Sequence, residues 1–315
     1  MNPGYTPVIG IDWGKRNRRA WLLDKHGQML GQHLDDKGDL SRESEFEEAL
    51  LELMDMWALR HADVLISGMA GSREGWLETP YLRAGQDLSM LGQGLCEVKL
   101  KRRELAQTRC RIVPGVCYTD ESGLPDVMRG EETLLYGAAL QGAGHGWVVL
   151  PGWHSKWVRL EYGAVRELES YMTGELYDLL GRQGSLASLT IMRQHDQGRF
   201  EAGLRRAGSE AAALTHEIFT CRALVVTDHM PALHAASYLS GLLIGAELHD
   251  MQRRMGAGKH PPAVHIIADM HLAQRYAQAL DFFGIRHQHW DPEQLYLSAL
   301  RALAGLPPGQ DKAAA

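Results

Sequence analysis

Apolar residues alternate with small or polar residues at the start of the chain, over 8–12 and again over 19–23. Alternation is typical of half-buried strands, and the polar turn between the segments predicts a β-hairpin. Apolar positions recur at helical spacing over 44–60, after an acidic start, which predicts an amphipathic helix. The apolar run over 63–72 predicts a buried strand that ends in a glycine-rich turn. This order predicts an α/β domain with a mixed sheet.

The same pattern begins again near the middle of the chain. Residues 109–118 predict a further strand and residues 130–141 a helix, before the glycine-rich break "QGAGHG". Residues 147–163 then repeat the order strand, polar turn, strand. This echo of the first hairpin predicts two similarly built domains, each opening with a β-hairpin.

The second half of the chain is predicted to be mostly helical. Residues 174–255 form the helical stretch, with a continuous helix over 235–255, and residues 263–284 predict strand, turn and helix. We expect an N-terminal domain over 1–142, a C-terminal domain over 143–305 and a disordered tail over 306–315.

Charge and composition limit the possible partners. The formal net charge of -6 gives no global basic field, so neither nucleic acid nor a membrane surface is expected as a partner. No apolar run approaches about 18 residues, so no membrane span is expected. The N-terminus has no signal-peptide pattern, and the four cysteines form no CxxC pair. We therefore expect a cytoplasmic protein with free thiols.

Seven short segments carry a resemblance to a known family. In chain order they are "IDWG..N.RAW" (11–21), "GMAGSREGW..TPYL" (68–82), "VPGVC" (113–117), "VMRGEETLLYGA" (127–138), "PGWHSKWV" (151–158), "MTGEL" (172–176) and "YLSGLLIGAEL" (238–248). With these segments the chain resembles the bacterial 2-dehydro-3-deoxygalactonokinase family over almost its whole length.

The resemblance implies a fold, a reaction and cofactors. The implied fold is that of the actin-like ATPase and sugar kinase superfamily, ribonuclease H-like, with two hairpin-led α/β domains and a nucleotide in the cleft between them. The implied reaction uses ATP and Mg²⁺ to phosphorylate the small sugar acid 2-dehydro-3-deoxy-D-galactonate on O6, in galactonate catabolism. The sequence leaves the oligomeric state open and is compatible with a homodimer.

Acidic and basic residues near the implied reaction centre have two readings each. Asp12 at the first hairpin tip would hold Mg²⁺, or it would only stabilise the turn. In "DVMRGEE", Arg129 would clamp the sugar acid, and Glu131 and Glu132 would be polar ligands or the base. The alternative for this string is a helix N-terminus with favourable acids in its first turn.

Further candidates for the sugar acid come from three segments. Ser72 and Arg73 follow the glycine-rich turn, Asp126 precedes Arg129, and Glu175 lies in the first turn of a predicted helix that Thr173 is expected to cap. Each also has a plain structural reading as a turn or helix-end residue.

The nucleotide would contact both hairpin loops, a glycine-bearing helix and the late strand–turn–helix. The implied contacts are Gly14, Lys15, Asn17, Gly152, His154, Lys156, Gly241, Gly245 and Asp269. The bland alternatives are ordinary helix packing for the two helical glycines and an outward-facing strand position for Lys156.

Three of these loops depart from the family pattern. Lys15 and Arg16 replace small hydroxyl residues, Trp153 replaces threonine, and Asp269 stands in a turn that is otherwise small. Trp153 would crowd a phosphate, whereas the two cations could pair with phosphate oxygens. The kinase therefore has two rivals: an impaired or repurposed paralogue that keeps the sugar-acid pocket, and a kinase with another phosphoryl donor.

Overall fold

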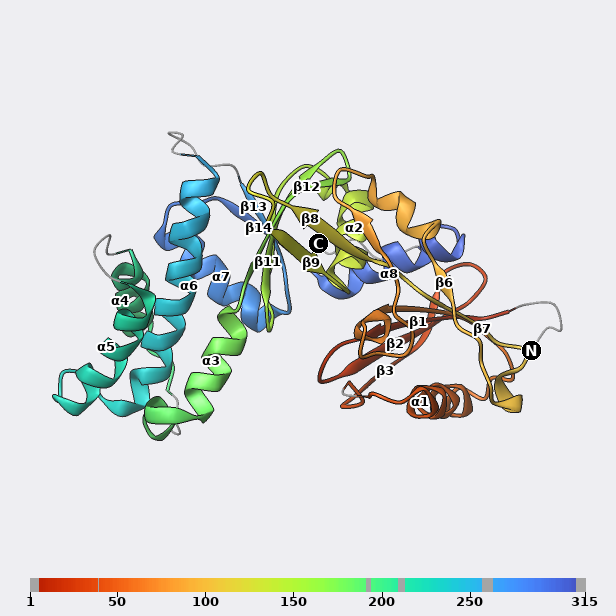
Figure 1. Cartoon of the computed structure of the whole chain (residues 1–315), viewed down its shortest axis with the longest axis horizontal. Coiled ribbons are helices and arrows are strands. Elements are labelled where there is room, and N and C mark those ends of the chain that lie inside the picture. The colour runs from red at the N-terminus through yellow and green to blue at the C-terminus, as the bar shows by residue number, and fades with distance from the viewer. Residues whose placement is uncertain (1–5, 39, 191–193, 209–212, 257–262, 310–315) are drawn as a thin grey trace. The chain divides into compact units, whose positions relative to one another are not determined.

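The computed structural model describes residues 6–38, 40–190, 194–208, 213–256 and 263–309 (Figure 1). The chain divides into two compact units. Unit 1 comprises residues 1–145, 159–168 and 292–315, and unit 2 comprises residues 146–158 and 169–291. The end of the expected tail, residues 310–315, lies outside the described residues. Within the described ranges, no helix combines the length and apolar character needed to cross a membrane.

Unit 1 is built around a six-stranded sheet (Figure 1). Its strands are β1 (Val8–Trp13), β2 (Arg18–Leu23), β3 (Met29–Asp35), β4 (Asp63–Gly68), β6 (Cys96–Glu97) and β7 (Arg109–Ile112). Their order in the sheet is β3-β2-β1-β4-β7-β6. Strand β1 runs antiparallel to β2 and parallel to β4, and β4 runs parallel to β7. The predicted hairpin and the buried strand after the first helix are confirmed.

Alternation along β1 gives the sheet two covered faces. Ile9, Ile11 and Trp13 point to one face, where α1 (Glu43–Met56) packs against them. Val8 points to the other face, which α8 (Pro292–Ala304) covers. Because Asp12 shares the parity of Val8, β1 directs Asp12 toward the face that α8 covers.

Two features of unit 1 differ from the sequence prediction. The single strand predicted over 109–118 is wrong, because the chain breaks between β7 and β8 (Gly115–Thr119), which lie in different sheets. Pro114 has no N–H to donate to a ladder and lies in this break. Helix α8, which we expected in the C-terminal domain, belongs to unit 1 because its apolar face packs on the first sheet.

Unit 1 also contains a smaller sheet, helix α2 and a short turn after β4. Strand β8 pairs with β5 (Tyr81–Arg83) and β9 (Pro125–Met128) in a separate three-stranded sheet. Helix α2 (Glu131–Ala138) follows β9 directly, which confirms the helix predicted there. A short 3₁₀ turn, Met69–Gly71, follows β4, as the glycine-rich sequence predicted.

Unit 2 repeats the architecture of unit 1. The sheet that begins in this unit consists of β10 (Gly146–Leu150), β11 (Ser155–Glu161), β12 (Ala164–Tyr171), β13 (Val264–Ile267) and β14 (His287–Trp290), in the order β12-β11-β10-β13-β14. The end of β11 and most of β12 fall within residues 159–168, which belong to unit 1. Strand β13 lies parallel to both β10 and β14. In both sheets a hairpin and its following strand lie at one side, in the order third, second, first, and two later strands follow on the other side. The order β12-β11-β10-β13-β14 thus corresponds to β3-β2-β1-β4-β7 of the first sheet. The predicted internal echo and the predicted α/β class, with two similarly built units that each open with a β-hairpin, are confirmed.

The helices of unit 2 fill the predicted helical stretch. They are α3 (Thr173–Arg182), α4 (Gln197–Ala207), α5 (Leu214–Val226), α6 (Ala235–Arg254) and, after β13, α7 (Met270–Phe282). Helices α4, α5 and α6 lie side by side (Figure 1). A Cβ atom on Gly241 of α6 would lie 2.0 Å from the carbonyl oxygen of Phe200 in α4. Glycine at this position therefore allows the two helices to touch along their backbones.

Substitution of Gly241 tests this close packing. We expect Gly241→Ala to lower the free energy of unfolding by about 1–3 kcal/mol, because the added methyl group overpacks a backbone contact. Urea denaturation measures the change. Gly198→Ala is the matched control: Gly198 also lies in a helix, α4, but an added Cβ would lie 3.5 Å from its nearest neighbour. Equal stability of the Gly241 variant and wild type would contradict the packing account.

Candidate active site

Polar side chains gather at the carboxyl ends of β1 and β4 in unit 1. We call this group the carboxylate edge; its members are Asp12, Arg19, Ser67, Glu132 and Tyr296. Asp12 pairs across the sheet with Arg19 on one side and with Ser67 on the other. Arg19 donates to Asp12 Oδ2 from both Nε, at 3.1 Å, and Nη2. Ser67 Oγ donates to the Tyr296 hydroxyl at 3.3 Å.

The side chains of the carboxylate edge shift one another's pKa values. Burial alone would lower the pKa of Arg19, but the Asp12 carboxylate outweighs it and raises that pKa. Burial raises the pKa of Tyr296, and the negative charges of Asp12 and Glu132 raise it further. The carboxylate edge is therefore a place where acids are crowded and only partly neutralised.

The carboxylates of Glu131 and Glu132 stabilise the turn that precedes α2 by accepting hydrogen bonds from its backbone amides. Glu131 Oε2 accepts from the Arg129 amide at 3.0 Å, and Glu132 Oε2 accepts from the Gly130 amide at 2.7 Å. A Cβ on Gly130, which has φ 111°, would lie 3.2 Å from the Gly68 Cα. The turn thus lies against the end of β4. Glu132 is fully buried, and burial together with Glu131 raises the pKa of Glu132 to about 8.

The Arg129 side chain is fixed by two neighbours. Its guanidinium donates to Thr79 Oγ1 and, at 3.0 Å, to the Thr79 carbonyl. It also lies over the ring of Tyr81, 4.4 Å from the ring centre. Within the described part of the chain, the buried Nε of Arg129 makes no hydrogen bond. Arg129 is therefore a preorganised cation with unused donor capacity.

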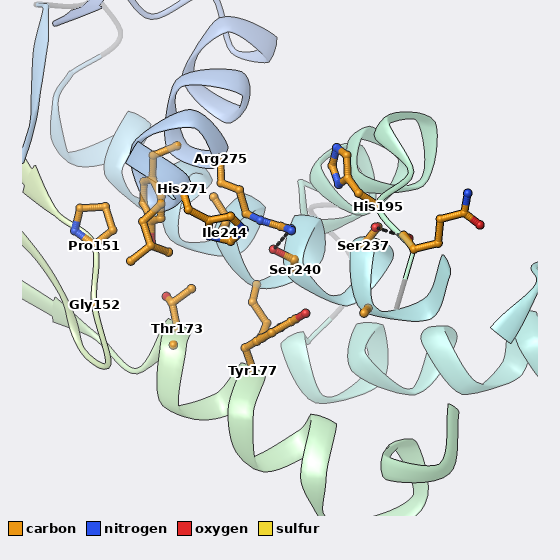
Figure 2. A pocket seen from close by; sticks show the side chains of 16 residues that line it. Pro151, Gly152, Thr173, Tyr177, His195, Ser237, Ser240, Ile244, His271 and Arg275 are labelled. Atoms are coloured by element: carbon orange, nitrogen blue, oxygen red, sulfur yellow. Dashed lines mark hydrogen bonds between the residues drawn. The ribbon is translucent and has the colours of Figure 1, made fainter. Parts of the chain in front are cut away.

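Unit 2 contains a cavity of about 290 Å³ (Figure 2). It is lined by Pro151 and Gly152 from the hairpin loop, Thr173, Gly174 and Tyr177 from α3, Gln194 and His195, Ala236, Ser237, Ser240, Leu243 and Ile244 from α6, and His271, Leu272, Arg275 and Tyr276 from α7. We call it the unit 2 pocket. No aspartate or glutamate is among these lining residues, so the pocket suits an anionic ligand with an apolar part.

One face of α6 supplies much of the pocket wall. Ser237, Ser240 and Ile244 follow one another at helical spacing and face the cavity (Figure 2). Arg275 of α7 reaches across and donates to Ser240 Oγ at 3.1 Å (Figure 2). The two helices therefore present hydroxyls and a guanidinium beside apolar side chains.

The hairpin loop of unit 2 is attached to the start of α3. A Cβ on Gly174 would lie 2.2 Å from the Gly152 carbonyl oxygen, so only glycine fits. The Glu175 amide donates to the Trp153 carbonyl at 2.9 Å. The Glu175 carboxylate lies 2.7 Å from His154 Nε2. These contacts join the hairpin loop and the start of α3 into one continuous part of the pocket wall.

Comparison with known proteins identifies a family with which this chain matches. The family model for 2-keto-3-deoxy-galactonokinase matches residues 12–303.

This chain belongs to the 2-keto-3-deoxy-galactonokinase family.

Two relatives and one solved structure agree with the family match. The 2-dehydro-3-deoxygalactonokinase of Escherichia coli K12 is 32% identical over 277 residues, 88% of this chain and 90% of the relative. The candidate 2-dehydro-3-deoxygalactonokinase DgoK1 of Rhizobium meliloti is 30% identical over 307 residues, 96% of this chain and 97% of the relative. The crystal structure of a candidate enzyme of the same name from Sinorhizobium meliloti superposes with a TM-score of 0.86 at 29% identity, covering 97% of this chain and 99% of that one. The family is one of phosphotransferases.

In unit 1 the structure brings only some of the expected residues together. Asp12 and Glu132 lie in the carboxylate edge, and Arg129 and Glu131 lie in the adjoining turn. Asp126 precedes them on β9, where its carboxylate accepts from the Val127 amide at 2.7 Å.

The other expected contacts of unit 1 lie in exposed loops. Arg73 is 87% exposed and has Glu78 as its ion-pair partner at 4.0 Å, so it is not part of the carboxylate edge. Ser72 is half-buried at the end of the 3₁₀ turn. Lys15 and Asn17 are exposed in the first hairpin loop, whose turn is closed by the Gly14 amide donating to the Asn17 carbonyl at 2.9 Å.

In unit 2 only some of the residues that were expected to contact the nucleotide line the pocket. Gly152 lines the pocket, whereas Gly241 and Gly245 are not among its lining residues and lie on the side of α6 that packs against α4. Gly241 packs against Phe200 and Gly245 against Leu204, which matches the alternative of ordinary helix packing. Asp269 is exposed and caps α7 by accepting from the Leu272 amide at 3.0 Å. Lys156 is buried in β11 and donates to Ser170 Oγ at 2.6 Å.

The expected helix cap at Thr173 is wrong. The hydroxyl of Thr173 donates to the buried carboxylate of Glu247 instead, and Met172 precedes the helix without a side-chain cap. Sequence reasoning also missed Ser237, Ser240 and Arg275. The signal that could have found the two serines is that they occupy core spacing on α6, where a polar side chain needs a reason.

The raised pKa of Glu132 gives a test by pH. Its ordinary value is 4.5, so between about 4.5 and 8 the folded state holds a proton that the unfolded state has released. Raising the pH through this window therefore lowers the free energy of unfolding, by on the order of 1 kcal/mol per pH unit. We expect Glu132→Gln to remove this loss, since an amide oxygen can still accept from Gly130. Urea denaturation at pH 5 and pH 8 measures it, with exposed Glu121→Gln as control. A pH dependence equal to wild type in Glu132→Gln would contradict the account.

Proposed function

We propose that this chain is an ATP- and Mg²⁺-dependent kinase that phosphorylates 2-dehydro-3-deoxy-D-galactonate on O6, a cytoplasmic step in the breakdown of galactonate. Membership of the family and the names of both curated relatives support the acceptor. The observation that carries the proposal is the unit 2 pocket, a cavity with apolar, hydroxyl and cationic lining beside a hairpin loop.

The chemistry of this pocket fits a nucleoside triphosphate. Leu243 and Ile244 offer an apolar surface for a base, and Ser237 and Ser240 offer hydroxyls for a ribose or base edge. Gly152 and Gly174 have no side chains, so their main chain can approach phosphate oxygens closely. Arg275 adds a guanidinium that can donate to a phosphate or another anionic group.

The residues of the carboxylate edge fit a magnesium ion. In the described ranges both hydrogen bonds to Asp12 use Oδ2, which leaves Oδ1 available to a cation or its water ligands. Among the described residues there is no cluster of three or more metal-binding side chains. One carboxylate suffices here, because Mg²⁺ in kinases takes most of its ligands from phosphates and water. When bound, the ion neutralises charge on the phosphoryl group in transfer.

Arg129 is the proposed anchor of the sugar acid. A carboxylate substrate needs a fixed cation, and a guanidinium held by Thr79 and Tyr81 loses little side-chain entropy on binding. Glu131 and Glu132 act on this anchor indirectly, since they hold the turn that carries it.

The proposed reaction relies on positioning more than on acid–base chemistry. The transition state of phosphoryl transfer is loose, so the protein mainly aligns the acceptor hydroxyl and stabilises charge. In this chain Arg129 orients the acceptor, Asp12 is the metal ligand, and the backbone at Gly152 and Gly174 supports the donor phosphates.

The structure also bears on the rival of an impaired paralogue. That reading relied on three altered loops, in one of which Trp153 was expected to crowd the phosphates. In unit 2 the hairpin loop contributes Pro151 and Gly152 to the pocket lining, and Trp153 is not among the lining residues. Trp153 instead contacts α3 through its carbonyl. This arrangement favours a working nucleotide pocket over a blocked one.

The decisive experiment is a coupled assay of the purified protein with ATP, Mg²⁺ and 2-dehydro-3-deoxygalactonate. We expect turnover of about 1–100 s⁻¹, the usual range for kinases. Replacing ATP by other triphosphates or pyrophosphate tests the donor. No turnover with any donor, together with a melting temperature that the sugar acid still raises, would refute the kinase and support the impaired paralogue.

Arg129→Ala tests the acceptor site. We expect the KM for the sugar acid to rise by roughly 10- to 100-fold with the KM for ATP unchanged, because a charge-assisted hydrogen bond is lost. Arg73→Ala is the matched control, since the exposed Arg73 carries the same charge in the same unit. The proposal for Arg129 fails if both variants change the KM for the sugar acid equally.

A further inference from the structure

A buried carboxylate lies beneath the unit 2 pocket without lining it. Glu247 of α6 is 2% exposed. It follows Leu243 and Ile244 by one helical turn, so it continues the face of α6 that lines the pocket. An ionisable side chain is costly to bury unless donors satisfy it, and its presence at this position calls for a role.

Three donors from three different elements satisfy this carboxylate. Trp157 Nε1 of β11 donates to Oε1 at 2.6 Å. The Tyr276 hydroxyl of α7 donates to Oε2 at 3.0 Å, and the Thr173 hydroxyl of α3 donates to the same oxygen. Ser155 Oγ lies 2.7 Å from the Tyr276 hydroxyl and extends the network to the start of β11. Glu247 thus joins four elements at one point.

Two of these donors are part of the pocket wall. Thr173 and Tyr276 both line the cavity. Thr173 also begins the turn of α3 that is attached to the hairpin loop, through the Gly174 contact with Gly152 and the Glu175 amide bond to the Trp153 carbonyl. A shift of Thr173 would therefore move the loop as well.

We propose that Glu247 is a positioning residue of the kinase: it fixes the Thr173 and Tyr276 walls of the unit 2 pocket and, through α3, the hairpin loop at residues 151–154. The inference rests on the proposed function for the identity of the ligand. Its geometric part, that Glu247 orders the first turn of α3 and this loop, concerns the protein without ligand.

The test uses variants that remove the acceptors or one donor. Glu247→Leu introduces an apolar side chain of similar size that has no hydrogen-bond acceptor. Thr173→Val removes only the link to α3 and serves as the second variant if Glu247→Leu folds poorly. Glu247→Gln is the conservative rescue, because its oxygen can accept from Trp157 while the hydroxyls turn toward its amide group. Glu217→Leu is the matched control: Glu217 is equally buried in unit 2, but it pairs with Arg206 of α4, outside the pocket.

Hydrogen exchange of the ligand-free proteins is the first readout. We expect exchange of the amides at 174–176, including the Glu175 amide, to rise by about tenfold in Glu247→Leu and Thr173→Val, the factor for one hydrogen bond to a charged group. Glu247→Gln should return toward wild type, and Glu217→Leu should leave these amides unchanged. Three results would overturn the inference: unchanged exchange at 174–176, a rise spread evenly over unit 2, or an equal rise at 174–176 in Glu217→Leu.

Titration with Mg²⁺ and a non-hydrolysable ATP analogue is the second readout. We expect the Kd of Glu247→Leu to rise by about tenfold and that of Glu217→Leu to match wild type. If wild type binds the analogue and Glu247→Leu binds it equally well, the positioning role is overturned. If wild type binds no nucleotide, the proposed function fails, and the exchange experiment still decides whether Glu247 orders the loop.

Discussion

The contact between α4 and α6 is the constraint on which the unit 2 pocket depends. Glycines at the contact allow the backbones to touch, so α6 has one fixed rotation relative to α4. With Gly241 and Gly245 directed at α4, the preceding residues Ser240 and Ile244 point about 100° away around the helix axis, toward the cavity. A helix with wider packing could rotate and exchange these faces. The packing of these glycines therefore decides which side chains of α6 line the pocket.

Alternation along the first strand has a comparable effect in unit 1. Because β1 turns Ile11 toward α1, it must turn Asp12 toward α8, where Arg19 and Tyr296 meet it. A slip of one residue in register would exchange an apolar core residue for the acid. The buried core thereby fixes the acid at the carboxyl end of the sheet, where ligands of α/β proteins bind.

The sequence was sufficient for the hairpins, the internal repeat and the family, since these depend on local pattern and on strings of motifs. It was not sufficient for contacts that depend on tertiary packing. Thr173 has the composition of a helix cap, yet a carboxylate 74 residues away takes its hydroxyl. Arg73 sits in a family motif but faces solvent. The break at Pro114 divides what reads as one strand between two sheets.

A crystal structure of the protein with Mg²⁺ and a non-hydrolysable ATP analogue tests the central claim most directly. The account predicts the nucleoside in the unit 2 pocket, with its base on Leu243 and Ile244, Arg275 within hydrogen-bonding distance of the ligand, and the phosphates beside the Gly152 and Gly174 backbone. A nucleotide bound elsewhere, with this pocket empty, would contradict it.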